Sequence, residues 1–97
     1  MRFEWDSRKA ASNCLKHGVT FEQAVEAFAD PHALVVPDVK HSTLRETRQW
    51  WLGTAQAGLL LVVFTVREPG GILRIISARR AHAKERLLYE SQEKSRH

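Results

Sequence analysis

The longest apolar stretch of the chain lies in its second half and predicts the centre of a sheet. Leu59–Val66 carries no charge and is rich in branched side chains, which is typical of a strand buried on both faces. Pro69 and Gly70 suit the two central positions of a type II turn, because proline fixes φ at the first and glycine accepts a positive φ at the second. Ile72–Ile76 has the pattern of a return strand, so the sequence predicts a hairpin.

Two helices are predicted near the N-terminus. Asp6 is a good N-cap for a helix over Ser7–Lys16. Thr20 and Gln23 have the spacing of a capping box, which starts a second helix that Asp30-Pro31 ends. The apolar face of this second helix recurs at i, i+3, i+4 and i+7, at Phe21, Ala24, Val25 and Phe28.

The rest of the chain alternates short strands with polar connections and ends in a charged helix. The further predicted elements are a short edge strand at Phe3–Trp5, strands at Ala33–Val36 and Arg45–Gly53, and a helix at Ala81–Glu93. We therefore expect an α+β fold: two N-terminal helices on one face of a small antiparallel meander of about four strands, then a C-terminal helix. With 97 residues the chain is expected to form a single domain over residues 1–97.

The net charge of +4 is unevenly distributed. Residues 1–66 carry seven Lys/Arg and seven Asp/Glu, whereas residues 67–97 carry eight and four. This asymmetry favours a polyanionic partner, either nucleic acid or an acidic protein surface. The alternative is a solvated basic helix with no partner.

Cysteine usage and hydropathy exclude several classes of protein. The single cysteine, Cys14, cannot form an internal disulfide and fits a reducing compartment. No apolar run approaches the roughly 20 residues of a membrane helix, so we expect a cytoplasmic protein without a membrane partner. Glycine-rich phosphate loops and histidine pairs at metal-ligand spacing are both missing from the sequence, so we expect no cofactor and no metal site.

Several short motifs occur in a fixed order along the chain. They are FEWD at Phe3–Asp6, KHGVTFEQA at Lys16–Ala24, Asp30-Pro31, Glu46-x-Arg48 before a tryptophan strand, and RIISARRA followed by ER and YE up to Glu90. This succession resembles the BrnT toxins of bacterial type II toxin–antitoxin systems. The resemblance implies a RelE-like ribonuclease fold and RNA as the substrate. It also implies a BrnA-like antitoxin with a ribbon-helix-helix domain, through which the pair binds operator DNA.

Metal-independent RNA cleavage needs a base for the 2′-OH proton, cations for the phosphate and an acid for the leaving oxygen. Arginine suits the second task because its planar guanidinium group can donate hydrogen bonds to two phosphate oxygens at once. The candidates are Arg48, Arg74, Arg79 and Arg80. If the last strand is regular, Arg74 and Arg80 share one face and Arg79 points to the other.

Other candidate residues each have a structural alternative. Glu46 is a candidate general base or an ion-pair partner of Arg48, and His17 a candidate for acid–base chemistry or a cation that caps its helix. Tyr89 could stack on a base or cover the edge of the core. Lys84 and Arg86 on the same helix, together with Arg74, are candidates for RNA binding.

Trp50 and Trp51 are expected on opposite faces of their strand, one in the core and the other as a stacking platform or partner contact. The leading hypothesis is a ribonuclease toxin. The alternative is a non-catalytic basic module that acts as a corepressor subunit with a DNA-binding partner.

Overall fold

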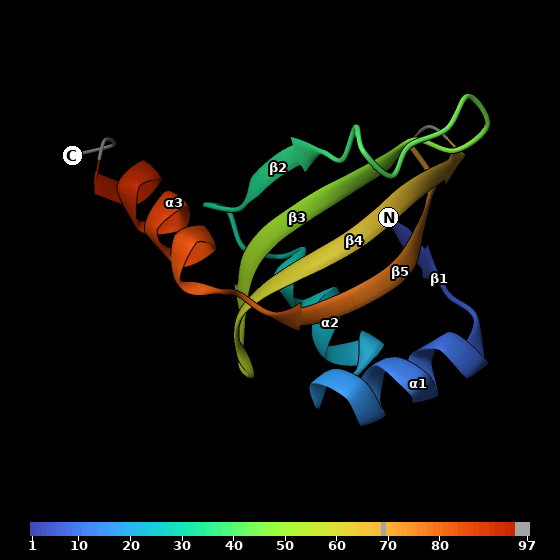
Figure 1. Ribbon diagram of the computed structural model, residues 1–97, viewed down its shortest axis with the longest axis horizontal. Coiled ribbons are helices and arrows are strands. Elements are labelled where there is room, and N and C mark those ends of the chain that lie inside the picture. The colour runs from blue at the N-terminus through green and yellow to red at the C-terminus, as the bar shows by residue number, and fades with distance from the viewer. Residues whose placement is uncertain (69, 95–97) are drawn as a thin grey trace.

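The computed structural model describes residues 1–68 and 70–94 and confirms the α+β fold, with helices and strands in the predicted order (Figure 1). The elements are β1 (Arg2–Glu4), α1 (Ser7–His17), α2 (Phe21–Ala27), β2 (Leu34–Pro37), β3 (Arg48–Ala55), β4 (Gly58–Glu68), β5 (Ile72–Arg80) and α3 (Ala83–Lys94). Within the described residues, none of the helices has the length and apolar character needed to cross a bilayer.

The strands form one five-stranded sheet in the order β1-β5-β4-β3-β2. Strands β2 to β5 make the predicted antiparallel meander. The short strand β1 lies at an edge, as expected, but it pairs with β5 in parallel, so the sheet is mixed. Between β4 and β5, Gly70 has the positive φ of 79° that the predicted turn requires, while Pro69 lies outside the described residues.

Strand β5 carries an extra residue that changes which way its side chains face. Val63 pairs with Ser77 and the next residue, Phe64, pairs with Ile75, so Ile76 has no partner on β4. Such a β-bulge interrupts the alternation of side chains between the two faces. As a result Ile75 and Ala78, three residues apart, both lie in the core beside α2.

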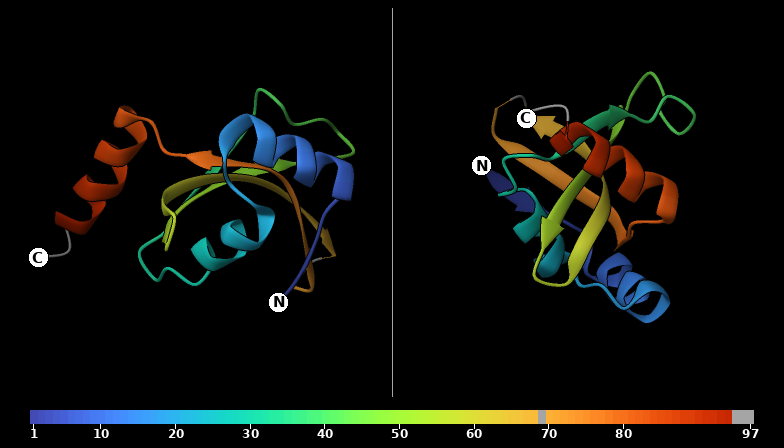
Figure 2. Two further views of the ribbon diagram at one scale, coloured as in Figure 1. Left: turned by 90° about the horizontal axis from the view of Figure 1, so that it is seen from below. Right: turned by 90° about the vertical axis from the view of Figure 1, so that its left-hand side faces the viewer.

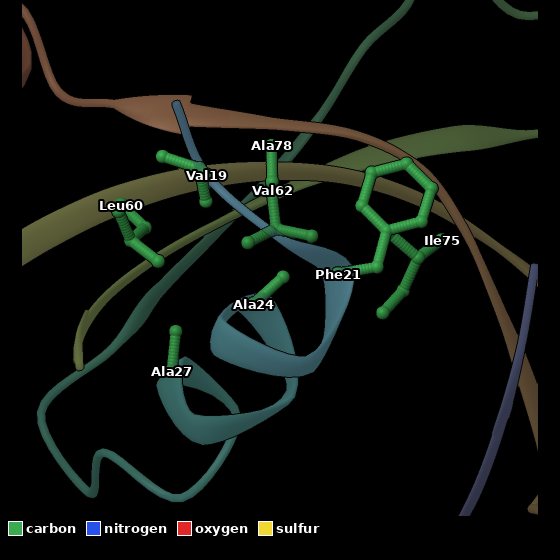
Figure 3. Close-up of a cluster of buried hydrophobic side chains, with 8 residues drawn as sticks. All are labelled: Val19, Phe21, Ala24, Ala27, Leu60, Val62, Ile75 and Ala78. Carbon is green, nitrogen blue, oxygen red and sulfur yellow. The ribbon is translucent and has the colours of Figure 1, made fainter. Parts of the chain in front are cut away.

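The two N-terminal helices occupy different places around the sheet. Helix α2 begins with the predicted capping box and packs against β3, β4 and β5. Its face enters a fully buried cluster whose members come from both layers: Val19, Phe21, Ala24, Ala27, Leu60, Val62, Ile75 and Ala78 (Figure 3). Helix α1 instead runs along the edge of β5 (Figure 2). Among the described residues, one face of the sheet is therefore filled by α2, and the other is left open except where α3 covers one end.

A glycine allows α2 to approach β3 closely. The indole Nε1–H of Trp51 donates a hydrogen bond of 2.7 Å to the carbonyl oxygen of Ala27, at the end of α2. A Cβ on Gly53 would lie 2.6 Å from the same oxygen, closer than any van der Waals contact. Gly53 therefore has no room for a side chain, because helix and strand meet at its Cα.

The side chain of Asn13 replaces a neighbouring strand at the free edge of β5. Its Nδ2 donates to the carbonyl oxygens of Ala78 (2.8 Å) and Val19 (3.0 Å), and its Oδ1 accepts from the amide of Ala78 (3.1 Å). Asn13 is only 7% exposed, so these bonds satisfy groups that water does not reach. They fix α1 to β5 just beyond the bulge.

Asn13→Ala should therefore destabilise the fold. It leaves one buried amide and two buried carbonyls without a partner, and a loss of at least about 2 kcal/mol in the free energy of unfolding is expected. Urea denaturation measures this, with Ser12→Ala on the neighbouring exposed position as the control. A loss no larger than that of the control would contradict the strand-replacing role.

Helix α3 is held to the rest of the molecule through Asp30. The Tyr89 hydroxyl donates a 2.6 Å hydrogen bond to Oδ2 of Asp30, which also accepts from the amide and hydroxyl of Thr54. Burial raises the pKa of Asp30, but the bonds from Tyr89, Thr54 and the amide of His32 outweigh burial and leave this pKa below its ordinary value. The charged form of Asp30 is thus the one that the fold stabilises.

Tyr89→Phe should remove this stabilisation while keeping the ring. A hydrogen bond to a charged group contributes about 1.5–3 kcal/mol, and a loss of this order is expected at pH 7. Because the pKa of Asp30 is lowered on folding, its contribution is complete above the ordinary aspartate pKa of about 3.9 and is lost as pH falls through the lower folded value. Denaturation of both proteins at pH 7 and pH 3 tests this, and a cost independent of pH would refute it.

Candidate functional site

The open face of the sheet carries a hollow of about 240 Å³. Its floor is apolar and comes from the middle of β3 and β4, at Trp50, Leu61 and Val63. Its walls are polar and charged: Asp38, His41, Arg48, Ser77 and Arg79. The strand register explains the arrangement, since Trp50, Val63 and Ser77 lie opposite one another across three strands. Arg48 and Arg79 reach the hollow from opposite sides of that row.

The two arginines of the hollow are each held by a glutamate. The Nε of Arg48 lies 3.0 Å from Oε1 of Glu46, and the bond leaves both terminal nitrogens of Arg48 without a hydrogen bond to any described residue. Arg79 makes a bidentate pair with Glu85 of α3, with both N–O distances 2.8 Å. Hydrogen bonds from Arg79 lower the pKa of Glu85 against the opposing effect of burial. Arg48 is thus the more available of the two.

A histidine–aspartate pair lies at the rim of the same hollow. The Nδ1 of His41 is 3.0 and 3.1 Å from the two carboxylate oxygens of Asp38, which is 6% exposed. Burial raises the pKa of Asp38, but hydrogen bonds from the side chains of Trp50 and His41 outweigh it and lower this pKa. An ionised Asp38 fixes the proton on Nδ1 and leaves Nε2 of His41 as the acceptor. The His41 side chain is 57% exposed and open to a ligand.

The loop that carries this pair is tied at both ends by one hydroxyl. The Oγ of Ser42 donates to the carbonyl of Asp38 (2.6 Å) and accepts from the amide of Arg48 (2.9 Å). The amide of Asp38 also donates to the carbonyl of Arg48 (2.9 Å), beyond the end of β2. Ser42 therefore fixes the histidine–aspartate pair relative to the arginine.

Sequence reasoning did not select Asp38, His41 or Ser42. The one local signal was the i, i+3 spacing of aspartate and histidine directly after Pro37. What makes them a site is the pairing of β2 with β3, which brings residues 38–41 beside Arg48. That pairing is not encoded in a local pattern.

The bulge at Ile76 changes the predicted placement of the last-strand arginines. Arg74 faces the open side of the sheet, opposite Thr65, and forms a 2.9 Å ion pair with Glu4. Arg79, not Arg80, shares this side with it. The expectation for a regular strand was therefore wrong, since the extra residue moves Arg80 to the face of α2. There the Nε of Arg80 donates to the carbonyl of Ala57 at 3.3 Å.

The other candidates lie apart from the hollow. His17 lines a separate groove between α1 and β5, and Lys84 and Arg86 are exposed on α3. Tyr89 is 6% exposed and packs with Leu52, Leu59 and Leu61, which favours the alternative that it covers the edge of the core. Glu46 pairs with Arg48 and also lines a neighbouring hollow where β3 begins and β4 ends.

The tryptophans face opposite sides, as predicted. Trp51 packs in the core with Phe28 and Phe64, at centroid distances of 4.7 and 6.4 Å. Trp50 lines the hollow. The site thus combines an apolar and aromatic floor, two arginines and an oriented imidazole, a set that can hold a phosphate and move a proton beside it.

Comparison with known proteins identifies the family of the chain. The family model described as the ribonuclease toxin BrnT of type II toxin–antitoxin systems matches residues 5–85. A search of curated proteins finds no match. The matched segment begins just before α1 and extends into the first turn of α3, so it contains every residue of the hollow. The chain belongs to the BrnT family of ribonuclease toxins, which act on RNA and are paired with an antitoxin.

Proposed function

We propose that the hollow on the open face is the catalytic centre and that it cleaves RNA without a metal ion. The observation that carries this proposal is the convergence of Arg48, Arg79 and His41 on one hollow with an aromatic floor. The reaction is attack of the 2′-oxygen on the adjacent phosphorus. The O2′–P bond forms as the P–O5′ bond breaks, which leaves a 2′,3′-cyclic phosphate and a free 5′-hydroxyl.

His41 acts as the general base in this scheme. Its Nε2 accepts the 2′-OH proton, while Asp38 holds the ring through Nδ1 and stabilises the imidazolium that forms. Asp38 is therefore a positioning residue. The leaving O5′ takes its proton from water or from the charged His41.

Arg48 is the principal phosphate ligand. Glu46 holds its Nε, so the two terminal nitrogens form a fixed fork that matches two phosphate oxygens. Arg79 adds a second positive charge, oriented by Glu85. In this assignment Glu46 positions Arg48 and is not the base, and Arg80, on the other face, has no part in catalysis.

Arg48→Ala should lower the rate of RNA cleavage by about 10²–10³-fold, the usual effect of removing one group that stabilises developing charge. Arg48→Lys should recover only part of the rate, because an ammonium cannot bind two oxygens in a fixed plane. Cleavage of a single-stranded RNA in the presence of a chelator is the measurement, and it also tests metal independence.

The matched control for this experiment is Arg45→Ala. Arg45 is exposed, lies three residues away and does not line the hollow, so its removal changes the charge equally. Wild-type activity in Arg48→Ala would reject the site. If the wild-type protein cleaves no RNA in the presence of a chelator, metal independence is rejected.

His41→Ala should lower the rate by about 10²–10⁴-fold and change its pH dependence. Because a general base must accept a proton in the reaction, the wild-type rate should rise with pH. This rise should be absent in His41→Ala and unchanged in His82→Ala, a histidine at the start of α3 that does not line the hollow. An unaltered pH profile in His41→Ala would assign the base elsewhere.

The partner is proposed from the family. A BrnA-like antitoxin with a ribbon-helix-helix domain would neutralise the toxin in the cytoplasm and bring the complex to operator DNA. The alternative, a non-catalytic corepressor subunit, is favoured only by the glutamates that neutralise Arg48 and Arg79. Induced expression without the antitoxin separates the two: growth arrest with RNA cleavage supports the toxin, and normal growth supports the corepressor.

A further inference from the structure

A second, basic groove of about 190 Å³ runs between α1 and the edge of β5. Its polar lining includes Lys9, Ser12, Lys16 and His17 from α1. Ser77 of β5 lines both this groove and the hollow with Arg48 and Arg79. A ligand in the hollow can therefore continue into the groove over the width of a single residue.

Helix α1 supplies positive charge without negative charge. The helix contains Arg8, Lys9, Lys16 and His17 and has no acidic residue. Lys9 and Lys16 are seven residues apart, so they lie on one side of the helix, separated by about 10 Å along its axis. Spaced cations along a groove suit an extended chain of phosphates.

The cations of the groove differ from those of the hollow in their partners. Within the described residues, neither lysine nor His17 forms an ion pair, whereas Arg48 and Arg79 each have a glutamate. The backbone amides of Lys9 and Arg8 donate hydrogen bonds to the Asp6 carboxylate and lower its pKa, and the positive charge of Lys9 lowers this pKa further. The charge of the groove is thus available to a ligand.

We propose that this groove binds the sugar–phosphate backbone of the RNA strand whose scissile phosphate occupies the hollow. The proposal rests on the proposed function and extends it to a binding path over Ser77. Arg80 extends the path, because its guanidinium approaches Gly18, directly after His17. His17 and Arg80 then serve in substrate binding.

The composition of the groove favours RNA over a protein partner. The centres of protein interfaces are apolar and aromatic and are depleted in lysine. Among the described residues, the lining of this groove consists of two lysines, a histidine, two serines and Asn13, with Ile76 as the one apolar residue. Its chemistry is that of a surface that tracks a backbone without reading bases.

The test is the salt dependence of RNA binding by the double variant Lys9→Ala/Lys16→Ala. The probe is a single-stranded RNA oligonucleotide with 2′-O-methyl groups, which cannot be cleaved because its nucleophile is blocked. Each lost phosphate contact lowers the slope of log affinity against log salt by about 0.7, so the slope should fall by about 1.4. The control Arg2→Ala/Arg8→Ala removes the same charge at exposed positions outside the groove and should retain most of the slope.

A catalytic measurement gives an independent result. The double variant should cleave a dinucleotide, which occupies only the hollow, at the wild-type rate, and should show a raised KM with longer RNA. Equal slopes in the groove and control variants would overturn the proposal. The proposal would also be overturned if the groove variant kept the wild-type salt slope for RNA but no longer bound the antitoxin. That result would assign the groove to the protein partner. If the wild type cleaves no RNA, the proposed function fails, but the slope still decides whether the groove binds RNA.

Discussion

The β-bulge at Ile76 is the constraint on which the site depends. Without the bulge, regular alternation beyond Ile75 would place Ala78 on the open side of the sheet and Arg79 on the side of α2. With it, Ala78 fills the core and Arg79 reaches the hollow. The bonds between Asn13 and the backbone of Ala78 follow directly after the bulge and hold the shifted register. A core contact and a candidate functional side chain are thus fixed by the same local irregularity.

The parts of the fold that were predictable from sequence are those with local signals. The capping box at Thr20 and the glycine turn at Gly70 are examples, because each depends on residues within one turn of the chain. The face of Arg79 was not predictable, since nothing in the pattern of β5 distinguishes a bulged strand from a regular one. The approach of His41 to Arg48 also depends on strand pairing, which sequence spacing does not report. The opposite faces of Trp50 and Trp51 did follow from simple alternation.

The distribution of charge has a different meaning in the structure than in the sequence. The basic excess lies in residues 67–97, yet two arginines of that region that face the open side are paired with glutamates, Arg74 with Glu4 and Arg79 with Glu85. These pairs orient the guanidinium groups and reduce the field they project. Helix α1, from the half of the chain that is neutral overall, presents its lysines without such partners among the described residues. Local pairing, not regional net charge, decides where an anion is attracted.

The hydroxyl of Ser42 has a consequence for the entropy of catalysis. Residues 38–47 form a loop that would sample many conformations, and ordering each residue costs about 1–2 kcal/mol in backbone entropy. By binding Asp38 and Arg48 at once, Ser42 divides that loop into two short segments, so its ordering is complete when the protein folds. In the proposed mechanism, the substrate then meets a base and a phosphate ligand that are already fixed relative to each other, so its binding energy remains for the transition state.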